Sequence, residues 1–317
     1  MRPLSAAIEA VELTKTYPGE VHAVRGVSFR VEQGESFGLL GPNGAGKSTT
    51  IGMLNTTVRP TSGRALLGGN DVNDDPIGAR AISTVVFQDA VVDEPLSGRR
   101  NLELHLRLWG VDDTEGHARL VELVGLVGLT AFLDRPVATY SGGQRRRLEI
   151  ARALVSDPQV VFLDEPTVGL DTRIRHDLFD VLSTLREQTG VTIFLTTHYL
   201  DEAERLCDRI AIVDRGVIVT TDTPANLVAA LGNEILELRV DDAAATAESL
   251  RRGGIPDGDI LVIGTTVTAS LRGRPGEPYL SRLGDDSIRV RSQTTRRPTL
   301  DDAYLRWTGG HIGTVGE

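Results

Sequence analysis

The sequence of residues 36–54, SFGLLGPNGAGKSTTIGML, contains a short apolar run, a glycine-rich loop and the beginning of a helical pattern. The loop, residues 41–48, matches Gly-x-x-x-x-Gly-Lys-Ser and lies between an expected strand and an expected helix, the context that a phosphate-binding loop requires. Its glycines let successive backbone N–H groups approach phosphate oxygens, and the positive end of the helix points at the same place. This stretch predicts an α/β fold that binds a nucleoside triphosphate.

Two side chains of this loop carry the expected chemistry. Lys47 supplies an ammonium group to the β- and γ-phosphates and is a predicted catalytic residue, whereas the Ser48 hydroxyl is a predicted ligand of Mg²⁺. Of the 34 basic residues only Lys15 and Lys47 are lysines, which indicates that the loop needs a compact charge that a planar guanidinium does not replace. The predicted nucleotide-binding residues here are Gly41, Pro42, Asn43, Gly44, Ala45, Gly46, Lys47, Ser48 and Thr49.

Charge and composition limit the classes of partner. A net charge of −10 opposes binding to phosphate backbones, and an aromatic share of 4% opposes stacking on bases, so we expect no nucleic-acid partner. The single cysteine, Cys207, excludes an intrachain disulfide. No apolar run approaches the roughly 20 residues that span a bilayer, and residues 1–12 lack a secretory h-region. We therefore expect a cytoplasmic protein.

The rest of the chain predicts two domains. Apolar runs at residues 81–87, 160–163, 192–196 and 210–213 alternate with helical stretches, as in a mostly parallel sheet covered by helices. Leucines at largely helical spacing predict an inserted helical subdomain at about residues 88–140. Beyond residue 232 strand-like and helix-like stretches follow one another, so we expect a nucleotide-binding domain over residues 1–232 and a small α+β domain over residues 233–317.

A pair of carboxylates follows another predicted strand. Residues 160–165, VVFLDE, are an apolar run that ends in Asp164 and Glu165. This places both acids at the carboxyl edge of the sheet, where open α/β folds bind their ligands. Asp164 is the predicted partner of Mg²⁺, and Glu165 is the predicted general base that polarises the attacking water.

The segment YSGGQ, residues 140–144, identifies a family. It resembles the signature motif of the ABC (ATP-binding cassette) ATPases, which other phosphate-loop enzymes lack, and the serine and glycines at a helix start form a second anion site. The resemblance implies a head-to-tail homodimer in which each signature closes on ATP held by the loop of the other subunit. It assigns nucleotide contacts to Ser141, Gly142, Gly143 and Gln144. The arginines that follow, Arg145 to Arg147, are expected on a solvated helix face.

The resemblance assigns roles to four more residues. Tyr17 matches the aromatic side chain that stacks on adenine, and Asp171 belongs to the loop that reaches across the dimer. His198 matches the histidine that contacts the γ-phosphate. Gln88 matches the glutamine that senses Mg²⁺ beside the contact with the membrane subunit. The predicted catalytic residues are thus Lys47, Gln88, Glu165 and His198, and the predicted metal ligands are Ser48, Gln88 and Asp164.

Other positions depart from the family or narrow it. Tyr140 stands where leucine is more common, and Arg100 replaces the usual glutamate, which leaves open how the chain couples to its membrane partner. Residues 298–305, PTLDDAYL, resemble the C-terminal extension of the daunorubicin/doxorubicin-resistance type of ABC ATPase. This resemblance favours export of drug or lipid-like cargo. The alternative is a C-terminal domain that merely stabilises the dimer.

We therefore expect the ATP-hydrolysing subunit of an ABC exporter, peripheral on the cytoplasmic side of the cell membrane, which uses ATP and Mg²⁺ and drives a separate transmembrane permease subunit by dimer closure. One alternative is a soluble ABC ATPase that acts in translation, DNA repair or iron–sulfur assembly. Another is an unrelated phosphate-loop kinase or GTPase. Residues 141–144 and the lack of an Asn-Lys-x-Asp motif oppose the latter.

Overall fold

The computed structural model describes residues 6–88 and 91–309 of the 317-residue chain. Two predictions fall partly outside the described residues. Residues 1–5 belong to the segment 1–12 that is expected to lack a secretory signal, and residues 89–90 belong to the predicted helical insertion. The chain divides into two compact units, residues 1–218 and 219–317. Within the described residues, no helix has both the length and the apolar character needed to cross a membrane.

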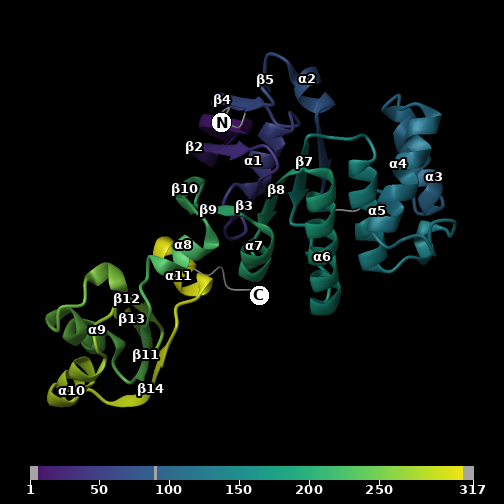
Figure 1. Cartoon of the computed structure of the whole chain (residues 1–317). Helices are drawn as coiled ribbons and strands as arrows, with labels where there is room; N and C mark the ends of the chain where they lie inside the picture. The colour runs from purple at the N-terminus through teal and green to yellow at the C-terminus, as the bar shows by residue number, and fades with distance from the viewer. Residues whose placement is uncertain (1–5, 89–90, 310–317) are drawn as a thin grey trace, which may run out of the picture. The chain divides into compact units, whose positions relative to one another are not determined.

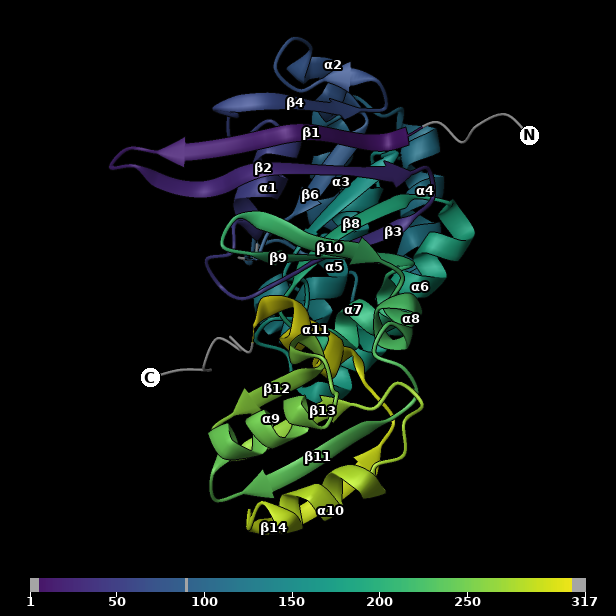
Figure 2. The same cartoon turned by 90° about the vertical axis from the view of Figure 1, so that its left-hand side faces the viewer.

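The first unit contains two sheets. A six-stranded sheet has the order β10 (Val217–Asp222), β9 (Arg209–Asp214), β3 (Ser36–Leu40), β8 (Thr192–Thr197), β7 (Val160–Asp164) and β6 (Ser83–Val86). Its strands from β9 to β6 pair in parallel. The other sheet has the order β2 (Val21–Glu32), β1 (Ala6–Tyr17), β4 (Ser62–Leu67) and β5 (Asn70–Asp71), and Figure 2 shows β1 and β2 as its long strands.

A group of aromatic side chains joins these two sheets. Phe29 on β2 stacks on Phe37 of β3 with ring centroids 5.6 Å apart, and Phe194 of β8 lies 5.5 Å from Phe29. All three belong to the core, which also includes Ile51 of α1 (Lys47–Leu54). Burying such rings stabilises a contact strongly, so these three phenylalanines hold the two sheets together.

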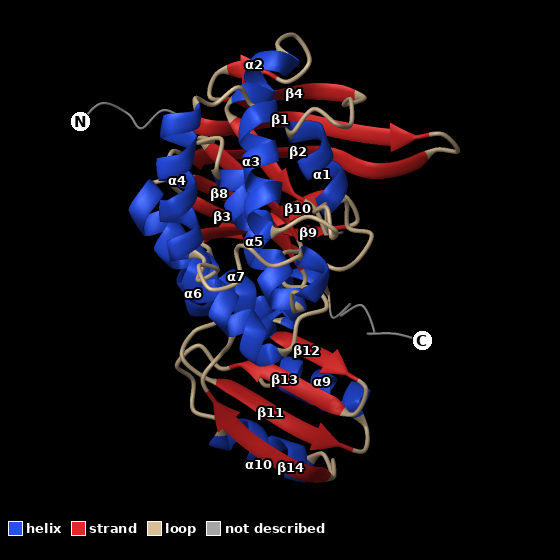
Figure 3. Ribbon diagram, turned by 90° about the vertical axis from the view of Figure 1, so that its right-hand side faces the viewer, coloured by secondary structure: helices blue, strands red, loops and turns tan. Residues whose placement is uncertain are grey.

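Helices cover the parallel sheet. The segment with predicted helical spacing contains α3 (Gly98–Leu108), α4 (Asp113–Leu126) and the 3₁₀ turn η1 (Val137–Thr139), and α3 and α4 pack against each other and on α5 (Gly142–Leu154). Figure 3 shows these helices as one group. The remaining helices of this unit are α2 (Pro76–Ala81), α6 (Thr172–Thr189) and α7 (Leu200–Leu206).

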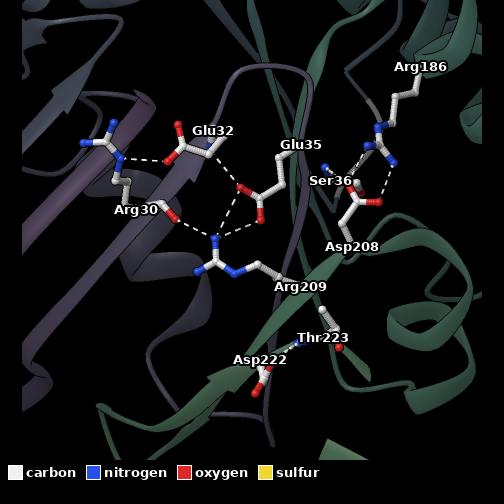
Figure 4. A network of polar contacts seen from close by, with 9 residues as sticks. All are labelled: Arg30, Glu32, Glu35, Ser36, Arg186, Asp208, Arg209, Asp222 and Thr223. Carbon is white, nitrogen blue, oxygen red and sulfur yellow. Dashed lines mark hydrogen bonds and ion pairs between the residues drawn. The ribbon is translucent and has the colours of Figure 1, made fainter. Parts of the chain in front are cut away.

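Charged side chains pair at the amino-terminal edge of the parallel sheet (Figure 4). Arg209 donates to Glu35 Oε1 over 3.1 Å, and Glu35 also accepts from the backbone of Glu32 over 2.7 Å. Asp208 forms an ion pair with Arg186 and accepts from the Ser36 N–H over 2.9 Å. These contacts tie the starts of β3 and β9 to the end of α6.

The second unit is a small α+β fold. Its antiparallel sheet has the order β12 (Ile260–Ile263), β13 (Thr266–Ser270), β11 (Ile235–Val240) and β14 (Val290–Arg296). Apolar residues of this sheet share a core with α9 (Ala243–Arg252) and α10 (Glu277–Asp285). Figure 2 shows both helices beside the sheet. The buried Asp259, in the turn η2 (Asp257–Asp259), holds Arg272 at 2.7 Å and Arg306 of α11 (Leu300–Thr308) at 2.6 Å.

The division of the chain falls inside β10, earlier than the boundary expected near residue 232. Helix α8 (Pro224–Ala229) lies between these two positions and packs against α11, the last described helix. The sequence could not locate this boundary because the contact joins segments about 75 residues apart. Residues 223–232, which follow β10, therefore belong with the second unit.

Candidate site for nucleotide binding and hydrolysis

The glycine-rich loop, residues 41–48, joins β3 to α1 along a path that only small residues allow. Gly46 has a φ angle of 99°, in the left-handed region that favours glycine. A Cβ atom would lie 2.3 Å from the carbonyl oxygen of Val213 if added at Gly41, and 2.3 Å from that of Ala23 if added at Gly46. A larger residue at either position would displace the loop from the start of α1, where a helix attracts anions.

Lys47, the first residue of α1, is buried, with 4% of its surface exposed. Its ammonium group donates to the carbonyl oxygens of Gly41, at 2.8 Å, and Pro42, at 3.1 Å. The same nitrogen lies 3.1 Å from Glu165 Oε1. An ammonium group has three N–H donors, and these three contacts use all of them.

Asp164 ends β7 beside the next residue of the loop. Its Oδ1 accepts a hydrogen bond from Ser48 Oγ over 3.1 Å and another from Thr196 on β8. The described residues contain no group of three or more His, Cys, Asp or Glu side chains that could hold a metal ion. Mg²⁺ is usually held by one or two carboxylates together with substrate phosphates and water, so Ser48 and Asp164 fit such a ligand set. The exposed Gln88 has no hydrogen bond or ion pair with either residue.

Glu165 lies between two cationic or potentially cationic groups. Its Oε2 is 3.3 Å from His198 Nδ1, on the side opposite to the Lys47 contact. The Glu165 backbone has a φ angle of 46°, a conformation that stores strain in a non-glycine residue. Its N–H holds that conformation by donating to the hydroxyl oxygen of Thr196 over 3.1 Å. His198 Nδ1 is buried and has no hydrogen bond of good geometry.

The structure does not join every predicted residue to this cluster. Among the described residues, Tyr17, Gln88 and Asp171 have no hydrogen bond or ion pair with Lys47 or Glu165. Tyr17 ends β1, with the Lys15 ammonium 5.0 Å from its ring centroid, and Gln88 is exposed just after β6. Asp171 caps α6 by accepting from the Ile174 N–H over 3.0 Å.

The signature segment forms the amino end of α5. The Ser141 side chain accepts from the Gln144 N–H over 3.2 Å, and the Gln144 side chain accepts from the Ser141 N–H over 3.0 Å, which makes a capping box. A Cβ atom at Gly143 would lie 2.5 Å from Ile174, so glycine is needed for close packing against α6. Tyr140 is buried and donates to the Phe132 carbonyl over 2.7 Å, a contact that a leucine could not make.

Arg146 was wrongly expected on a solvated helix face. It is 6% exposed and donates to the carbonyl oxygens of Pro166, at 2.7 Å, and Phe87, at 2.6 Å, and to Glu149 at 2.9 Å. It thereby ties the signature helix to the segment after Glu165 and to the end of β6. The sequence contained a signal for the burial of Arg146. Gly143, Arg146, Ile150 and Leu154 follow helical spacing and lie on one buried face of α5.

A cavity of about 460 Å³ lies at the opposite edge of the parallel sheet. Its lining includes Ser36, Arg186 and Asp208, near the starts of β3 and β9. Arg186 and Asp208 pair with each other there. Because open α/β folds bind their ligands at the carboxyl ends of the strands, the candidate nucleotide site is the loop at that edge and not this cavity.

Comparison with known proteins agrees with this geometry. Residues 24–168 match the family model described as ABC transporter. The daunorubicin/doxorubicin resistance ATP-binding protein DrrA of Streptomyces peucetius is 42% identical over 96% of this chain and 92% of its own length. The Nod factor export ATP-binding protein I of Paraburkholderia xenovorans is 40% identical over 96% of this chain and 97% of its own length. The chain belongs to the ABC transporter family.

Solved structures of ABC proteins share the fold. The cbiO1 protein of Clostridium perfringens, part of an ABC transporter complex, has a TM-score of 0.67 and 28% identity over 71% of this chain and 91% of its own. A dimeric ATP-binding cassette in a post-hydrolysis state with ADP and Pi has a TM-score of 0.61 and 28% identity over 68% of this chain and 98% of its own. The predicted α/β phosphate-loop fold, the family and the ATPase activity are therefore confirmed. The roles of single residues stay predictions.

Proposed function

We propose that this ABC ATPase is the subunit that drives a separate transmembrane permease to export a drug or lipid-like hydrophobic cargo, from a peripheral position on the cytoplasmic side of the cell membrane. The names of similar proteins support export, because they concern drug resistance in Streptomyces peucetius and Nod factor export in Paraburkholderia xenovorans. The same names oppose a soluble ATPase without a transport role.

The position of Glu165 between Lys47 and His198 is the observation that supports the hydrolytic roles. Because all three Lys47 donors are engaged, a phosphate oxygen would replace Glu165 as one of its partners. The Glu165 carboxylate would then be free to accept a hydrogen bond from water and act as general base. His198, on its other side, would donate a hydrogen bond to the charge that develops on the γ-phosphate.

We assign Mg²⁺ to Ser48 and Asp164, whose oxygens lie 3.1 Å apart. Mg²⁺ held there would neutralise charge on the β- and γ-phosphates during transfer. Gln88, two residues after β6, is the third proposed ligand. Tyr17 would supply the adenine contact.

We propose further that two copies act as a head-to-tail dimer. The amino end of α5 presents Ser141 and Gly142 at the surface, where helix N–H groups can bind the γ-phosphate of ATP held by the other copy. Asp171 begins α6 next to this segment, and a Cβ atom at Gly142 would lie 3.6 Å from Leu170. The signature and the loop that ends at Asp171 are therefore placed to move as one surface.

The permease contact is assigned to an apolar surface on α3. Leu104 and Leu108 are 43% and 76% exposed, and the neighbouring Trp109 and Val91 are also exposed. With His105 and Arg152, the two leucines and Val91 line a surface pocket of about 310 Å³. A cluster of exposed apolar side chains of this kind is typical of an interaction surface. Arg146 bonds the Phe87 carbonyl and so links the end of β6, near this surface, to the signature helix.

The test is Glu165→Gln, which preserves shape and removes the base. The variant should bind ATP with Mg²⁺, hydrolyse it more than about 100-fold more slowly and accumulate as a dimer in size-exclusion chromatography with light scattering. Glu94→Gln is the matched control, because Glu94 is an exposed carboxylate whose ion pair in the described part of the chain is with Arg145, away from the phosphate loop. Near-normal turnover by Glu165→Gln would refute the assignment of the base.

A further inference from the structure

Glu202 on α7 is a charged residue that the predicted site does not use. It is 0% exposed, and neither of its carboxyl oxygens accepts a hydrogen bond of good geometry. Helix α7 packs against α6, β3 and β8, and Figure 1 shows it beside α6 below the parallel sheet. A buried carboxyl group without strong partners is costly, so its presence inside the site-bearing unit calls for a physical role.

The groups around Glu202 belong to the segments that carry the candidate catalytic residues. The hydroxyls of Thr197 and Thr167 lower the pKa of Glu202. The Thr197 hydroxyl also accepts from the Tyr199 N–H over 2.9 Å, which fixes it at the end of β8. Thr197 immediately precedes His198, and its carbonyl oxygen accepts from the Gly41 N–H over 3.2 Å. Thr167 is fully buried, and its hydroxyl has no hydrogen bond of good geometry.

Thr167 follows Glu165 by two residues. Glu165 accepts from the Val168 N–H over 3.3 Å, and Thr167 accepts from the Leu170 N–H over 3.1 Å, so these residues form one tight turn. A shift of Thr167 would therefore move the Glu165 carboxylate. A shift of Thr197 would move both His198 and the start of the phosphate loop.

We propose that Glu202 is a positioning residue for ATP hydrolysis: its buried carboxyl braces the turn that carries Glu165 against the strand end that carries His198. The inference rests on the roles proposed above for those two residues. Glu202 does not touch the nucleotide. It fixes the distance between the base and the histidine, on which alignment of the attacking water depends.

The brace should be sensitive to pH. Burial raises the pKa of Glu202 to about 7, while the Thr197 and Thr167 hydroxyls oppose this effect. Asp201 of the same helix raises the pKa and Arg175 of α6 lowers it. Cys207, at the end of α7, is buried as a neutral thiol because burial also raises its pKa. Burial favours the neutral form of Glu202, although the two hydroxyls favour the ionised form. Ionisation as the pH rises through about 7 would leave a charge in an apolar interior, and the cost of that charge should displace the Glu202 side chain and loosen the brace.

The experiment measures kcat and KM for ATP with the full chain between about pH 6 and about pH 8. If the neutral form is the active one, kcat of the wild type should fall by up to about tenfold across this range while KM changes little. Glu202→Gln keeps the shape and a hydrogen-bond donor but cannot ionise, so its kcat should stay near the wild-type acid value throughout. Glu204→Gln, the same change on the exposed face of α7, should keep the wild-type profile.

A second variant tests the proposal even if Glu202→Gln fails to fold. Thr167→Val removes only the hydroxyl, and we expect kcat to fall several-fold at about pH 6 without a matching change in KM. The proposal is overturned if Glu202→Gln retains the wild-type fall of kcat with pH, or if Thr167→Val keeps the wild-type kcat. An error in the assignment of Glu165 as general base can be told apart from a failure of this proposal. In that case Glu165→Gln would remain active, whatever the result for Glu202→Gln.

Discussion

The two edges of the parallel sheet differ in how their charged groups are paired. At the amino-terminal edge, Glu35 and Asp208 each accept from an arginine and from a backbone N–H (Figure 4). Ser36 Oγ and Glu32 Oε2 at this edge are buried without a hydrogen bond of good geometry, but each carboxylate there keeps an arginine partner. By contrast, His198 Nδ1 after β8 and both carboxyl oxygens of Glu202 on α7 are buried with no hydrogen bond of good geometry. A structural edge can satisfy its charges within the chain, whereas a catalytic edge must keep groups available for phosphate and water.

The backbone is strained beside the candidate catalytic residues. Glu165 keeps a left-handed φ angle of 46° at the catalytic edge, in contact with Lys47 and near His198. Strain of this kind persists only where the surroundings hold it, here through the hydroxyl of Thr196. If this comparison is correct, substitutions at the two edges should separate activity from stability.

The largest effect is expected at Lys47. Lys47→Ala removes the ammonium that bonds the loop and Glu165, so ATP hydrolysis should fall by about 1000-fold or more, measured as phosphate release at saturating Mg²⁺. Lys15, the other lysine, lies on β1 and donates to the Arg59 carbonyl. Lys15→Ala should keep kcat within about twofold of the wild type. Equal losses in both variants would mean that Lys47 has no special role.

A large effect on stability is expected at Arg146. Arg146→Ala breaks its bonds to Pro166 and Phe87 and leaves Glu149 buried without its partner, so the free energy of unfolding should fall by about 3 kcal/mol in urea titrations. Arg145→Ala on the same helix loses a partly exposed pair with Glu94 and should cost less than about 1 kcal/mol. Similar values for the two arginines would contradict the tie between α5 and the catalytic turn.

The smallest effect is expected at the amino-terminal edge. Arg186→Ala removes an ion pair with Asp208 that is partly exposed, so the free energy of unfolding should fall by about 1 kcal/mol. Turnover per folded molecule should not change, because neither residue contacts the phosphate loop. A fall in kcat of more than about threefold, with folding verified by circular dichroism, would show that the two edges are coupled.

Sequence reasoning predicted the fold class because its signals are local. The apolar runs that became β3 and β7 were visible in their composition, and the loop between β3 and α1 follows a fixed spacing. The environments of Arg146 and Glu202 were not predicted. A charged residue on a helix is normally exposed, and burial depends on neighbours that the sequence brings from other segments.

The sequence by itself determined the phosphate loop. Glycine at positions such as Gly46 is required by local sterics, and Lys47 is the next residue in the chain. Only the tertiary structure decided that Glu165 lies between Lys47 and His198. These three residues follow three different strands, and the order of β3, β8 and β7 in the sheet brings their ends together. Strand order is set by packing across the whole unit, which no single segment of sequence records.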